Sequence, residues 1–167
     1  MSGERVKAIA GSIVFLFVAP GIVAGVIPWA ISGYRMQPAL LGLEPLRWLG
    51  GLLLALGAVL LLETFARFAL QGLGTPAPIA PTKTLVVTGS YRFVRNPMYV
   101  AVVSLILGQA LLLGSLLTLG YGAVVWLTVH LFVLTYEEPT LSQSFGAQYD
   151  RYRANVRRWI PRLTPWQ

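Results

Sequence analysis

The chain has 167 residues, of which 56% are hydrophobic and only 11% are charged, and its mean hydropathy is +0.67. Soluble domains carry about 25% charged residues, so this composition excludes an ordinary soluble globule and predicts a membrane protein. The net charge is +7. In a membrane protein such an excess indicates cytoplasmic loops beside anionic lipid rather than nucleic-acid binding, so we expect membrane lipids and no nucleic acid as partners.

The chain has no cysteine and a single histidine, His130. The lack of cysteine excludes disulfides, thiolate nucleophiles and cysteine-ligated metals. One histidine excludes a multi-histidine metal site within one chain, and we expect no metal centre. The sequence also contains no glycine-rich nucleotide loop and no nucleophile elbow, which removes several common enzyme classes.

Four apolar runs are predicted as membrane spans, since a helix needs about 20 apolar residues to cross the hydrocarbon core. They cover residues 8–31, 46–73, 98–117 and 121–136. The fourth run is short for a span, so we expect its polar end to lie at the membrane interface. The first run is longer than the apolar region of a signal peptide, about 7–15 residues, so we expect a retained span. Pro20-Gly21 lies within it and predicts a kink. The predicted fold is an all-α membrane protein with four transmembrane helices in one domain, residues 1–167.

A polar connector joins the second and third runs. Residues 74–81 contain three prolines and must be irregular. Residues 84–88 are short and β-branched, which predicts an extended segment against the membrane face. Asn96-Pro97 is typical of a helix start, with asparagine as the cap and proline in the first turn.

The last segment, residues 141–160, has a different pattern. Apolar residues recur at helical spacing, and arginines fill much of the remaining surface. The apolar set is Leu141, Phe145, Tyr149, Tyr152, Val156 and Ile160, and the basic set is Arg151, Arg153, Arg157 and Arg158. This pattern is typical of an amphipathic helix on an anionic membrane surface, and Trp159 and Trp166 suit anchoring at the interface.

The placement of Lys and Arg predicts the orientation. Basic residues precede the first run, follow the second and follow the fourth, whereas the loop after the first run has only Arg35 and Arg47. The positive-inside rule then places both termini and the connector on the cytoplasmic side. The membrane that we expect is the plasma membrane of a prokaryote.

Two polar clusters are separated by two predicted crossings. The first is the stretch Gly89–Tyr99 and the second is Tyr136–Pro139. Because two crossings return the chain to the side that it left, both clusters should meet at one membrane surface. We therefore predict a single site there.

The second cluster contains two adjacent carboxylates. Glu137 and Glu138 lie on nearly the same helical face as His130. Neighbouring carboxylates repel each other and need a cationic partner, which Arg92, Arg95 or a cationic ligand can supply. The alternative that stays open is that both glutamates end a helix and form exposed ion pairs.

A second ionisable pair ends the second run. Glu63 and Arg67 are four residues apart and lie on one helical face. Charges in or near the bilayer are costly and should face protein or a polar cavity. Two interpretations stay open, a structural pair that locks two helices or a contact for the head group of a substrate.

The second half of the chain resembles a known superfamily. The stretch Tyr91-Arg92-Phe93-Val94-Arg95-Asn96-Pro97-Met98-Tyr99, the hairpin, Glu137-Glu138 and Phe145-Gly146-Ala147-Gln148-Tyr149-Asp150-Arg151-Tyr152 are similar to the isoprenylcysteine carboxyl methyltransferases, a superfamily that includes the phospholipid N-methyltransferases. Many relatives have histidine where this chain has Asn96. The Asn-Pro-Met-Tyr and Tyr-Glu-Glu-Pro stretches are closer to the phospholipid branch and the Phe-Gly-x-x-Tyr-x-x-Tyr stretch to the isoprenylcysteine branch, so the methyl acceptor stays open.

This resemblance implies an integral-membrane enzyme that transfers a methyl group from S-adenosylmethionine to a lipid or lipophilic acceptor at the cytoplasmic face. The residues that it places around the cofactor are Leu85, Val86, Val87, Gly89, Tyr91, Arg95, Asn96, Pro97, Tyr99, Gln109, Glu137 and Glu138. The first four would line the adenosine, and the two glutamates would bind the amino group or the ribose. His130 would point into the same pocket.

The implied chemistry needs few side chains, because the protein mainly aligns the acceptor and excludes water. A carboxylate or thiolate acceptor that arrives ionised needs no base. An amine needs a proton acceptor, for which Glu137, Glu138 or His130 is available. A lipid acceptor would enter between the second and fourth helices, with its head group near Glu63 and Arg67.

Two other functions remain as alternatives. Membrane sterol and steroid reductases resemble this superfamily in their terminal helices and use NADPH, and Lys83, Arg92 and Arg95 could contact its phosphates. The chain is short for a dinucleotide pocket. The third function is a small non-catalytic membrane scaffold. Binding of S-adenosylmethionine, of NADPH or of neither distinguishes the three.

Overall fold

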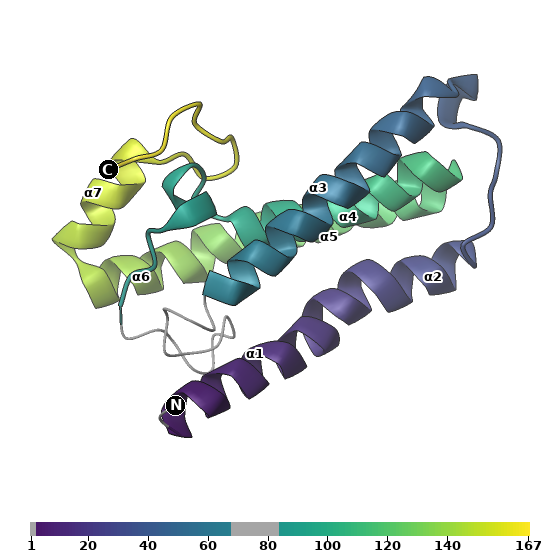
Figure 1. Cartoon of the computed structure of the whole chain (residues 1–167). Coiled ribbons are helices and arrows are strands. Elements are labelled where there is room, and N and C mark those ends of the chain that lie inside the picture. The colour runs from purple at the N-terminus through teal and green to yellow at the C-terminus, as the bar shows by residue number, and fades with distance from the viewer. Residues whose placement is uncertain (1–2, 68–83) are drawn as a thin grey trace.

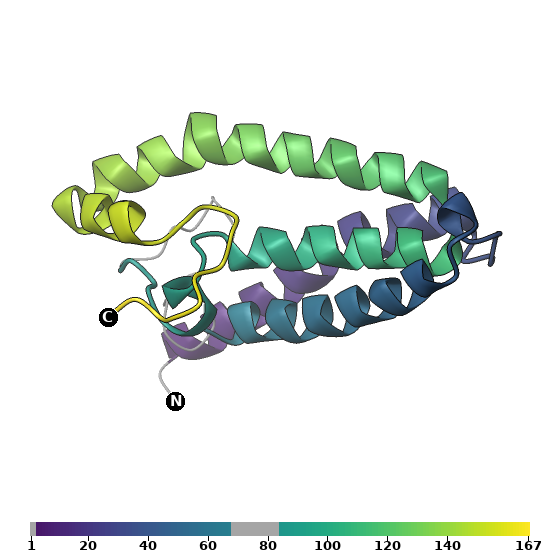
Figure 2. The ribbon, with the colours of Figure 1, turned by 90° about the horizontal axis from the view of Figure 1, so that it is seen from above.

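The computed structural model describes residues 3–67 and 84–167, with side chains from Ala10 onward except Ser12. Long helical segments lie side by side, and the chain runs back and forth along them (Figures 1 and 2). The start of the first helix, residues 84–96 of the connector and the C-terminal segment lie at one end of this bundle. The fold thus gathers at one end the segments that the sequence predicts on one side of the membrane.

The first helix begins as α1 (Gly3–Gly21), continues through the π-helical turn η1 (Ile22–Val26) and ends as α2 (Ile27–Ser32). The π turn lies between Pro20 and Pro28. A proline ring clashes with the carbonyl four residues earlier and cannot donate a hydrogen bond to it, and a π turn is a wider turn that relieves such a defect. The irregularity predicted at Pro20-Gly21 is thus a π turn that follows this dipeptide.

The π turn leaves backbone carbonyls for other helices. The Nε2 of Gln109 donates to the carbonyl oxygen of Ala24 at 2.7 Å, and the Tyr121 hydroxyl donates to that of Val23 at 2.9 Å. Ala24 lies four residues before Pro28, which has no N–H to offer it. Neighbouring helices therefore satisfy the carbonyls, as a proline inside a membrane helix requires.

The second helix, α3 (Pro45–Arg67), and the third, α4 (Pro97–Leu113), pack closely along their length. A Cβ added to Gly50 would lie 2.6 Å from the Leu112 nitrogen and 2.7 Å from the Gly108 oxygen. Only glycine permits this separation of the two backbones. Gly50 is thus required at this crossing, whereas the neighbouring Gly51 faces open space.

The loop between the first two long helices contains the 3₁₀ turn η2 (Leu40–Gly42) and is tied to the far end of the bundle. The Arg47 guanidinium donates to the carbonyl oxygens of Leu112 and Gln37, each at 2.6 Å. It also forms an ion pair with the exposed Glu44 at 2.8 Å. This end of the bundle therefore has its own charged anchor, separate from the predicted site.

The fourth helix is longer than the sequence indicated. It runs without interruption through α5 (Leu116–Phe132), the π turn η5 (Val133–Glu137) and α6 (Glu138–Phe145). Gly114 ends α4 with φ +74°, and the Ser115 hydroxyl caps the next helix by accepting from the Thr118 N–H at 3.2 Å. The prediction that this run starts at Tyr121 and stops at Tyr136 was therefore wrong at both ends. Gly120 is helical, and the π turn η5 lets the helix continue past Pro139.

Within residues 3–67 and 84–167, three segments are long and apolar enough to cross a membrane. They are Ile13–Ser32, Pro45–Arg67 and Leu116–Phe145. The helix α4 is apolar but shorter, with 17 residues, or about 25 Å against a hydrocarbon core of about 30 Å. The described residues contain helices and no strand, which confirms the all-α membrane class, whereas the count of four crossings stays a prediction.

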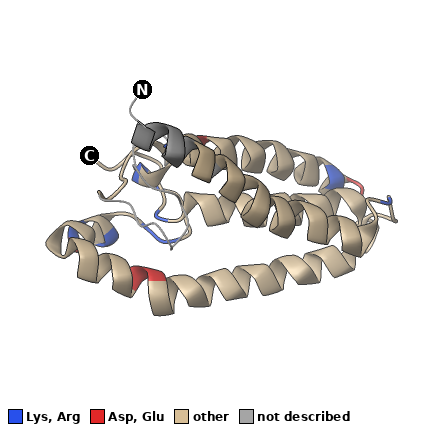
Figure 3. Cartoon of the chain, turned by 90° about the horizontal axis from the view of Figure 1, so that it is seen from below, with Lys and Arg blue, Asp and Glu red and all other residues tan. Residues whose placement is uncertain are grey.

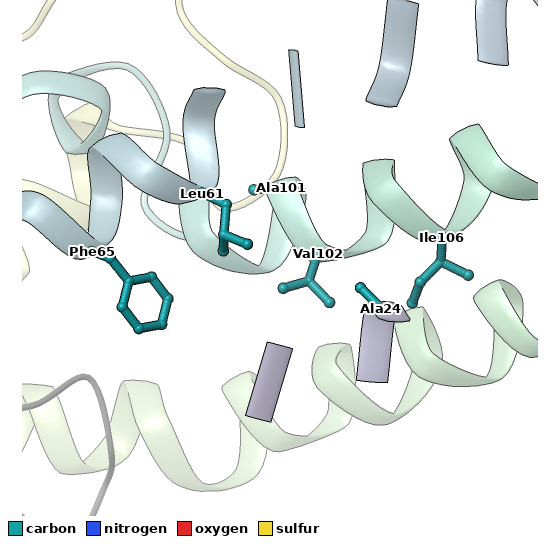
Figure 4. Close-up of a cluster of buried hydrophobic side chains, with 6 residues drawn as sticks. All are labelled: Ala24, Leu61, Phe65, Ala101, Val102 and Ile106. Atoms are coloured by element: carbon teal, nitrogen blue, oxygen red, sulfur yellow. The ribbon is translucent and has the colours of Figure 1, made fainter. Parts of the chain in front are cut away.

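The core lies where the first helix, α3 and α4 meet. Its buried members are Ala24, Leu61, Phe65, Ala101, Val102 and Ile106 (Figure 4). The outward face of α3 is apolar too, with Leu52, Leu56, Val59 and Leu62 more than half exposed. Such a face fits lipid rather than water.

The C-terminal segment differs most from its prediction. Residues 141–160 do not form one amphipathic helix, because Gly146 adopts φ +47° and separates α6 from α7 (Ala147–Asn155). Val156 is already extended. Tyr149, Tyr152 and Val156 are at most 3% exposed and form a small core, against which Leu85 and Val87 of the connector pack. The predicted lipid-facing stripe is thus mostly buried within the protein, although Ile160 is exposed.

The described part of the connector contains one 3₁₀ turn, η4 (Gly89–Arg92), and the C-terminal segment runs beside it. Backbone N–H groups of Arg95, Arg162 and Trp166 donate to the carbonyls of Arg157, Phe93 and Arg92, each at 2.9 Å. The connector and the chain end thus support each other. The predicted helical stretch 68–73, the proline segment 74–81 and Lys83 lie outside the described residues.

Candidate active site

The two predicted polar clusters come together at this end of the bundle. Tyr99, in the first turn of α4, donates its hydroxyl proton to Glu137 Oε2 at 2.9 Å. Arg95, just before that helix, forms an ion pair with Glu138 Oε1 at 3.1 Å. The acidic pair lies where η5 passes into α6, and Figure 3 shows it as an isolated acidic band on the fourth helix.

A π turn precedes the acidic pair for a local reason. Pro139 follows η5 at the same spacing at which Pro28 follows η1. The wider π turn avoids the clash of the proline ring with the preceding turn. It also changes the direction of the side chains beyond it relative to a regular α-helix, so Pro139 contributes to where the two carboxylates point.

Glu138 is fully engaged by two arginines. Arg158 binds it in a bidentate manner, with Nε to Oε1 at 2.6 Å and Nη2 to Oε2 at 2.9 Å. Only 14% of the Glu138 side chain and 10% of the Arg95 side chain are exposed. The hydrogen bond that Arg158 donates to Glu138 raises the pKa of the Arg158 guanidinium above its ordinary value, so Arg158 stays charged in this charge-assisted contact.

The prediction that Arg92 or Arg95 is the cationic partner of the acidic pair is therefore only partly confirmed. Arg95 is one partner, but Arg92 instead donates from Nε to the carbonyl oxygen of Trp166 at 2.5 Å. Arg158 was missed, because the helical pattern assigned it to a solvated basic face together with other arginines.

Glu137 has a different environment from its neighbour. Among the described residues it makes no ion pair, and its partner is the neutral hydroxyl of Tyr99. Its side chain is partly buried. A partly buried carboxylate without a cation is costly, so this position suits a positively charged ligand group.

Arg95 offers the complementary feature. Its Nε is buried and has no hydrogen-bond partner within the described part of the chain. Its Nη1 is shared between Glu138 and the Tyr149 hydroxyl, which lies at 3.3 Å. Burial, together with Glu138, raises the pKa of Tyr149 above its ordinary value, so this hydroxyl stays neutral. The site thus presents an unmatched donor at Arg95 close to an unmatched carboxylate at Glu137.

His130 is held by the C-terminal segment. Its Nδ1 accepts a hydrogen bond from the Trp159 indole N–H at 2.9 Å, and its ring stacks on Trp126 at a centroid distance of 5.2 Å. Because Nδ1 is the acceptor here, the neutral ring carries its proton on Nε2. Neither nitrogen of this arrangement is then a spare proton acceptor.

Asn96 and Pro97 lie at the N-cap and in the first turn of α4, as predicted, but the expected capping hydrogen bond is not formed. The Asn96 Nδ2 donates to the Arg158 carbonyl at 3.2 Å. The asparagine therefore connects the helix start to the C-terminal segment. Tyr91, also predicted in the site, is buried, and its carbonyl accepts from the Tyr152 hydroxyl at 2.7 Å.

Glu63 and Arg67 bind each other and hold the connector. Glu63 Oε2 accepts from the Ser90 hydroxyl at 2.6 Å. The Arg67 guanidinium lies where a side chain at Gly89 would be, and Gly89 has φ +53°. These contacts favour the structural interpretation of the pair, and its contact with a substrate stays a prediction.

Other predicted cofactor residues lie elsewhere. Leu85 and Val87 pack against the tyrosine core of α7, and Val86 is buried. Gln109 is ten residues along α4 from Tyr99, about 15 Å, and binds the first helix. The structure therefore does not bring Gln109 to the acidic pair.

The fold and this site define an integral membrane protein with a charged site at one end of an apolar bundle. The family model of the phospholipid methyltransferases matches residues 46–148, more than half of the chain, from α3 into α7. The protein belongs to the phospholipid methyltransferase family. This confirms the predicted superfamily.

A relative agrees with this assignment. A protein-S-isoprenylcysteine O-methyltransferase of Schizosaccharomyces pombe is 38% identical over 78 residues, which cover 46% of this chain and 33% of that protein. The matched segment thus spans about a third of that relative. No solved structure matches the chain. Arg157, Arg158 and Trp159 lie beyond the segment that the family model matches.

Proposed function

We propose that the protein transfers a methyl group from S-adenosylmethionine to a lipid or lipophilic acceptor at the cytoplasmic face of the membrane. Membership of the family supports methyl transfer. The observation that carries the choice of cofactor is a pair of groups that have no charged or hydrogen-bonding match within residues 3–67 and 84–167. They are the Glu137 carboxylate, which has no cation there, and the buried Arg95 Nε, which has no acceptor there.

These residues fit the amino-acid end of S-adenosylmethionine, which carries one ammonium and one carboxylate. Glu137, oriented by Tyr99, would hold the ammonium, and Arg95 would donate to the carboxylate. The adenosine would lie against the connector at Gly89 and Tyr91, where the apolar residues Leu85, Val86 and Val87 support the wall. A zwitterionic group is thus matched by charges that the protein leaves unpaired.

When bound, the cofactor supplies a methyl group that its sulfonium has already activated. The protein's contribution is then alignment of the acceptor and exclusion of water. The ends of the apolar helices and residues 84–96 would enclose the site, and a lipophilic acceptor would approach along the exposed apolar faces of α3 and the fourth helix.

The three predicted proton acceptors are engaged in this arrangement. Glu138 binds two arginines, His130 accepts from Trp159, and Glu137 would hold the ammonium. A site without a spare base favours an acceptor that arrives ionised, such as a carboxylate or a thiolate, over an amine. The relative that matches is named for O-methylation, which agrees with an oxygen acceptor.

Cofactor binding tests the proposal. S-adenosylmethionine, S-adenosylhomocysteine and NADPH would be titrated by calorimetry into the purified protein, its Glu137→Gln variant and the matched control Glu44→Gln, whose carboxylate is exposed at the far end. We expect the first two ligands to bind, with about tenfold or greater weakening in Glu137→Gln and none in Glu44→Gln. Binding of NADPH alone would instead indicate a reductase.

The acceptor class has its own test. Membranes would be incubated with S-adenosylmethionine carrying a labelled methyl group, and the labelled lipid fraction would be treated with alkali. A methyl ester releases its label as methanol, whereas an N-methyl group keeps it. We expect release, and retention of the label would show an amine or a thiol acceptor.

A further inference from the structure

Three consecutive residues of the C-terminal segment contact four residues predicted for the site. The Arg157 carbonyl accepts from the Arg95 N–H at 2.9 Å, and the Arg158 carbonyl accepts from Asn96 Nδ2 at 3.2 Å. The Arg158 side chain holds Glu138, and the Trp159 indole donates to His130 at 2.9 Å. We call residues 157–159 the strap.

The strap joins two separate elements of the site. Through its backbone it binds the turn that leads into α4, and through its side chains it binds the fourth helix. Arg158 contributes to both contacts, because its carbonyl binds Asn96 and its guanidinium binds Glu138. The strap therefore fixes the separation between Arg95 and the acidic pair, which the sequence leaves to long-range packing.

The strap also distinguishes the two carboxylates. Glu138 is held by Arg158 and Arg95 and has both oxygens occupied, whereas the Tyr99 hydroxyl is the one partner of Glu137 in the part of the chain that the structure describes. An ion pair of this kind is lost at high cost when one partner is removed, because the other charge stays buried. Glu138 thus has a structural role, and Glu137 is the carboxylate that can bind a ligand.

We propose that Arg158 and Trp159 are positioning residues of the active site, holding Glu138 and His130 so that Glu137 alone presents its carboxylate to the ligand. This inference rests on the proposed function for the ligand, but the strap itself can be tested without any cofactor. It also lies outside the segment that the family model matches, and so concerns a feature of this chain.

A thiol probe reports the closure of the strap. The chain has no cysteine, and Val156 is 1% exposed beside the strap, so Val156→Cys supplies a single hidden thiol. Labelling of this thiol by a maleimide would be timed in the otherwise unchanged chain and with Arg158→Ala, Arg158→Lys, Trp159→Phe or Glu138→Gln added. The matched control is Arg153→Ala, whose ion pair with Asp150 is about half exposed.

We expect Arg158→Ala and Glu138→Gln to speed labelling about tenfold or more, because each leaves a partner charge unpaired. Arg158→Lys should be intermediate, since lysine cannot form the bidentate contact. Trp159→Phe keeps the ring but loses the N–H, and should speed labelling by a smaller factor. Arg153→Ala and Glu137→Gln should leave the labelling rate unchanged.

Kinetics then separate positioning from general instability. Arg158→Ala should raise the KM for S-adenosylmethionine about tenfold, with a smaller change in kcat and with Arg158→Lys recovering part of the loss. The proposal is overturned if Arg158→Ala and Arg153→Ala label and bind alike, or if Glu137→Gln speeds labelling as much as Glu138→Gln. If the unmodified protein binds no S-adenosylmethionine but the labelling rates differ as expected, the proposed function is wrong, whereas the positioning role of the strap is supported.

Discussion

Glu137 and Glu138 are neighbours in the sequence, but neighbouring side chains of a helix point about 100° apart. Their carboxylates therefore meet different partners. One meets the Tyr99 hydroxyl and the other meets two guanidinium groups. The different roles of the two glutamates therefore follow from the direction of each side chain and from the segment that packs against it.

The hydroxyl of Tyr99 orients Glu137 and can be removed alone. Tyr99→Phe should weaken S-adenosylmethionine binding about three- to tenfold and lower the free energy of unfolding by about 1 kcal/mol, the usual worth of one hydrogen bond. Calorimetry and thermal unfolding measure the two effects. Tyr136→Phe, at a position that is 50% exposed, is the control, and equal losses in both variants would contradict the orienting role.

Two buried tyrosines, Tyr91 and Tyr152, make the folded state less stable at alkaline pH. Burial raises the pKa of Tyr91 and Tyr152 above the ordinary value, which is about 10. Above that pH the unfolded chain loses these protons while the folded chain keeps them, so their stabilising contribution is full below about pH 10 and is lost as the pH rises.

Tyr152→Phe checks this dependence, because it keeps the ring and removes the hydroxyl bond to the Tyr91 carbonyl. Below pH 10 the variant should be less stable than the natural protein by about 1 kcal/mol. Above pH 10 the deficit should shrink, because the variant has one group fewer to ionise. Thermal unfolding across pH measures both, and a deficit that stays constant would show that Tyr152 does not titrate on unfolding.

At the scale of elements, the crossing of α3 and α4 depends on a glycine where two backbones nearly touch. Gly50→Ala should lower the free energy of unfolding by about 1–3 kcal/mol, the usual cost of an overpacked site, since its Cβ would lie 2.6 Å from backbone nitrogen. Gly51→Ala, which meets open space, should be neutral or slightly stabilising. Thermal unfolding in detergent compares the pair, and similar stabilities would mean that the helices can separate without loss.

Much of this level could be predicted from the sequence. The apolar runs, the start of α4 at Pro97 and the meeting of the two polar clusters all follow from composition and from the number of crossings. These features depend on local patterns, which a single sequence carries. The ends of the fourth helix were missed because Gly120 and Pro139 predict breaks, whereas the helix starts earlier, at the Ser115 cap, and continues through a π turn past Pro139.

The strap could not be predicted for a different reason. In the sequence, Arg158 is one of several arginines at helical spacing, and nothing distinguishes it from Arg153 or Arg157. Its role depends on the chain leaving the helix at Asn155 and returning beside the connector, which long-range packing decides. The one available signal was Gly146, a residue that readily adopts positive φ and that interrupts the supposed amphipathic helix.

In the whole molecule, charge and apolar surface are separated along the bundle. Figure 3 shows Lys and Arg at the two ends and almost none between them. The end with the site carries the strap, the connector and both ends of the chain. The prediction that this end is cytoplasmic stays a prediction, and the apolar middle of the bundle fits lipid.

The uninterrupted fourth helix also sets the height of the site. The stretch from Leu116 to Glu137 measures about 33 Å at 1.5 Å per residue, close to the thickness of a typical hydrocarbon core, about 30 Å. In a thicker bilayer the carboxylates would be drawn below the head groups, and in a thinner one the helix would have to tilt. The length of this helix should therefore match the thickness of the hydrocarbon core. Methyl transfer, measured in vesicles of graded acyl-chain length, should be fastest where the two lengths are equal.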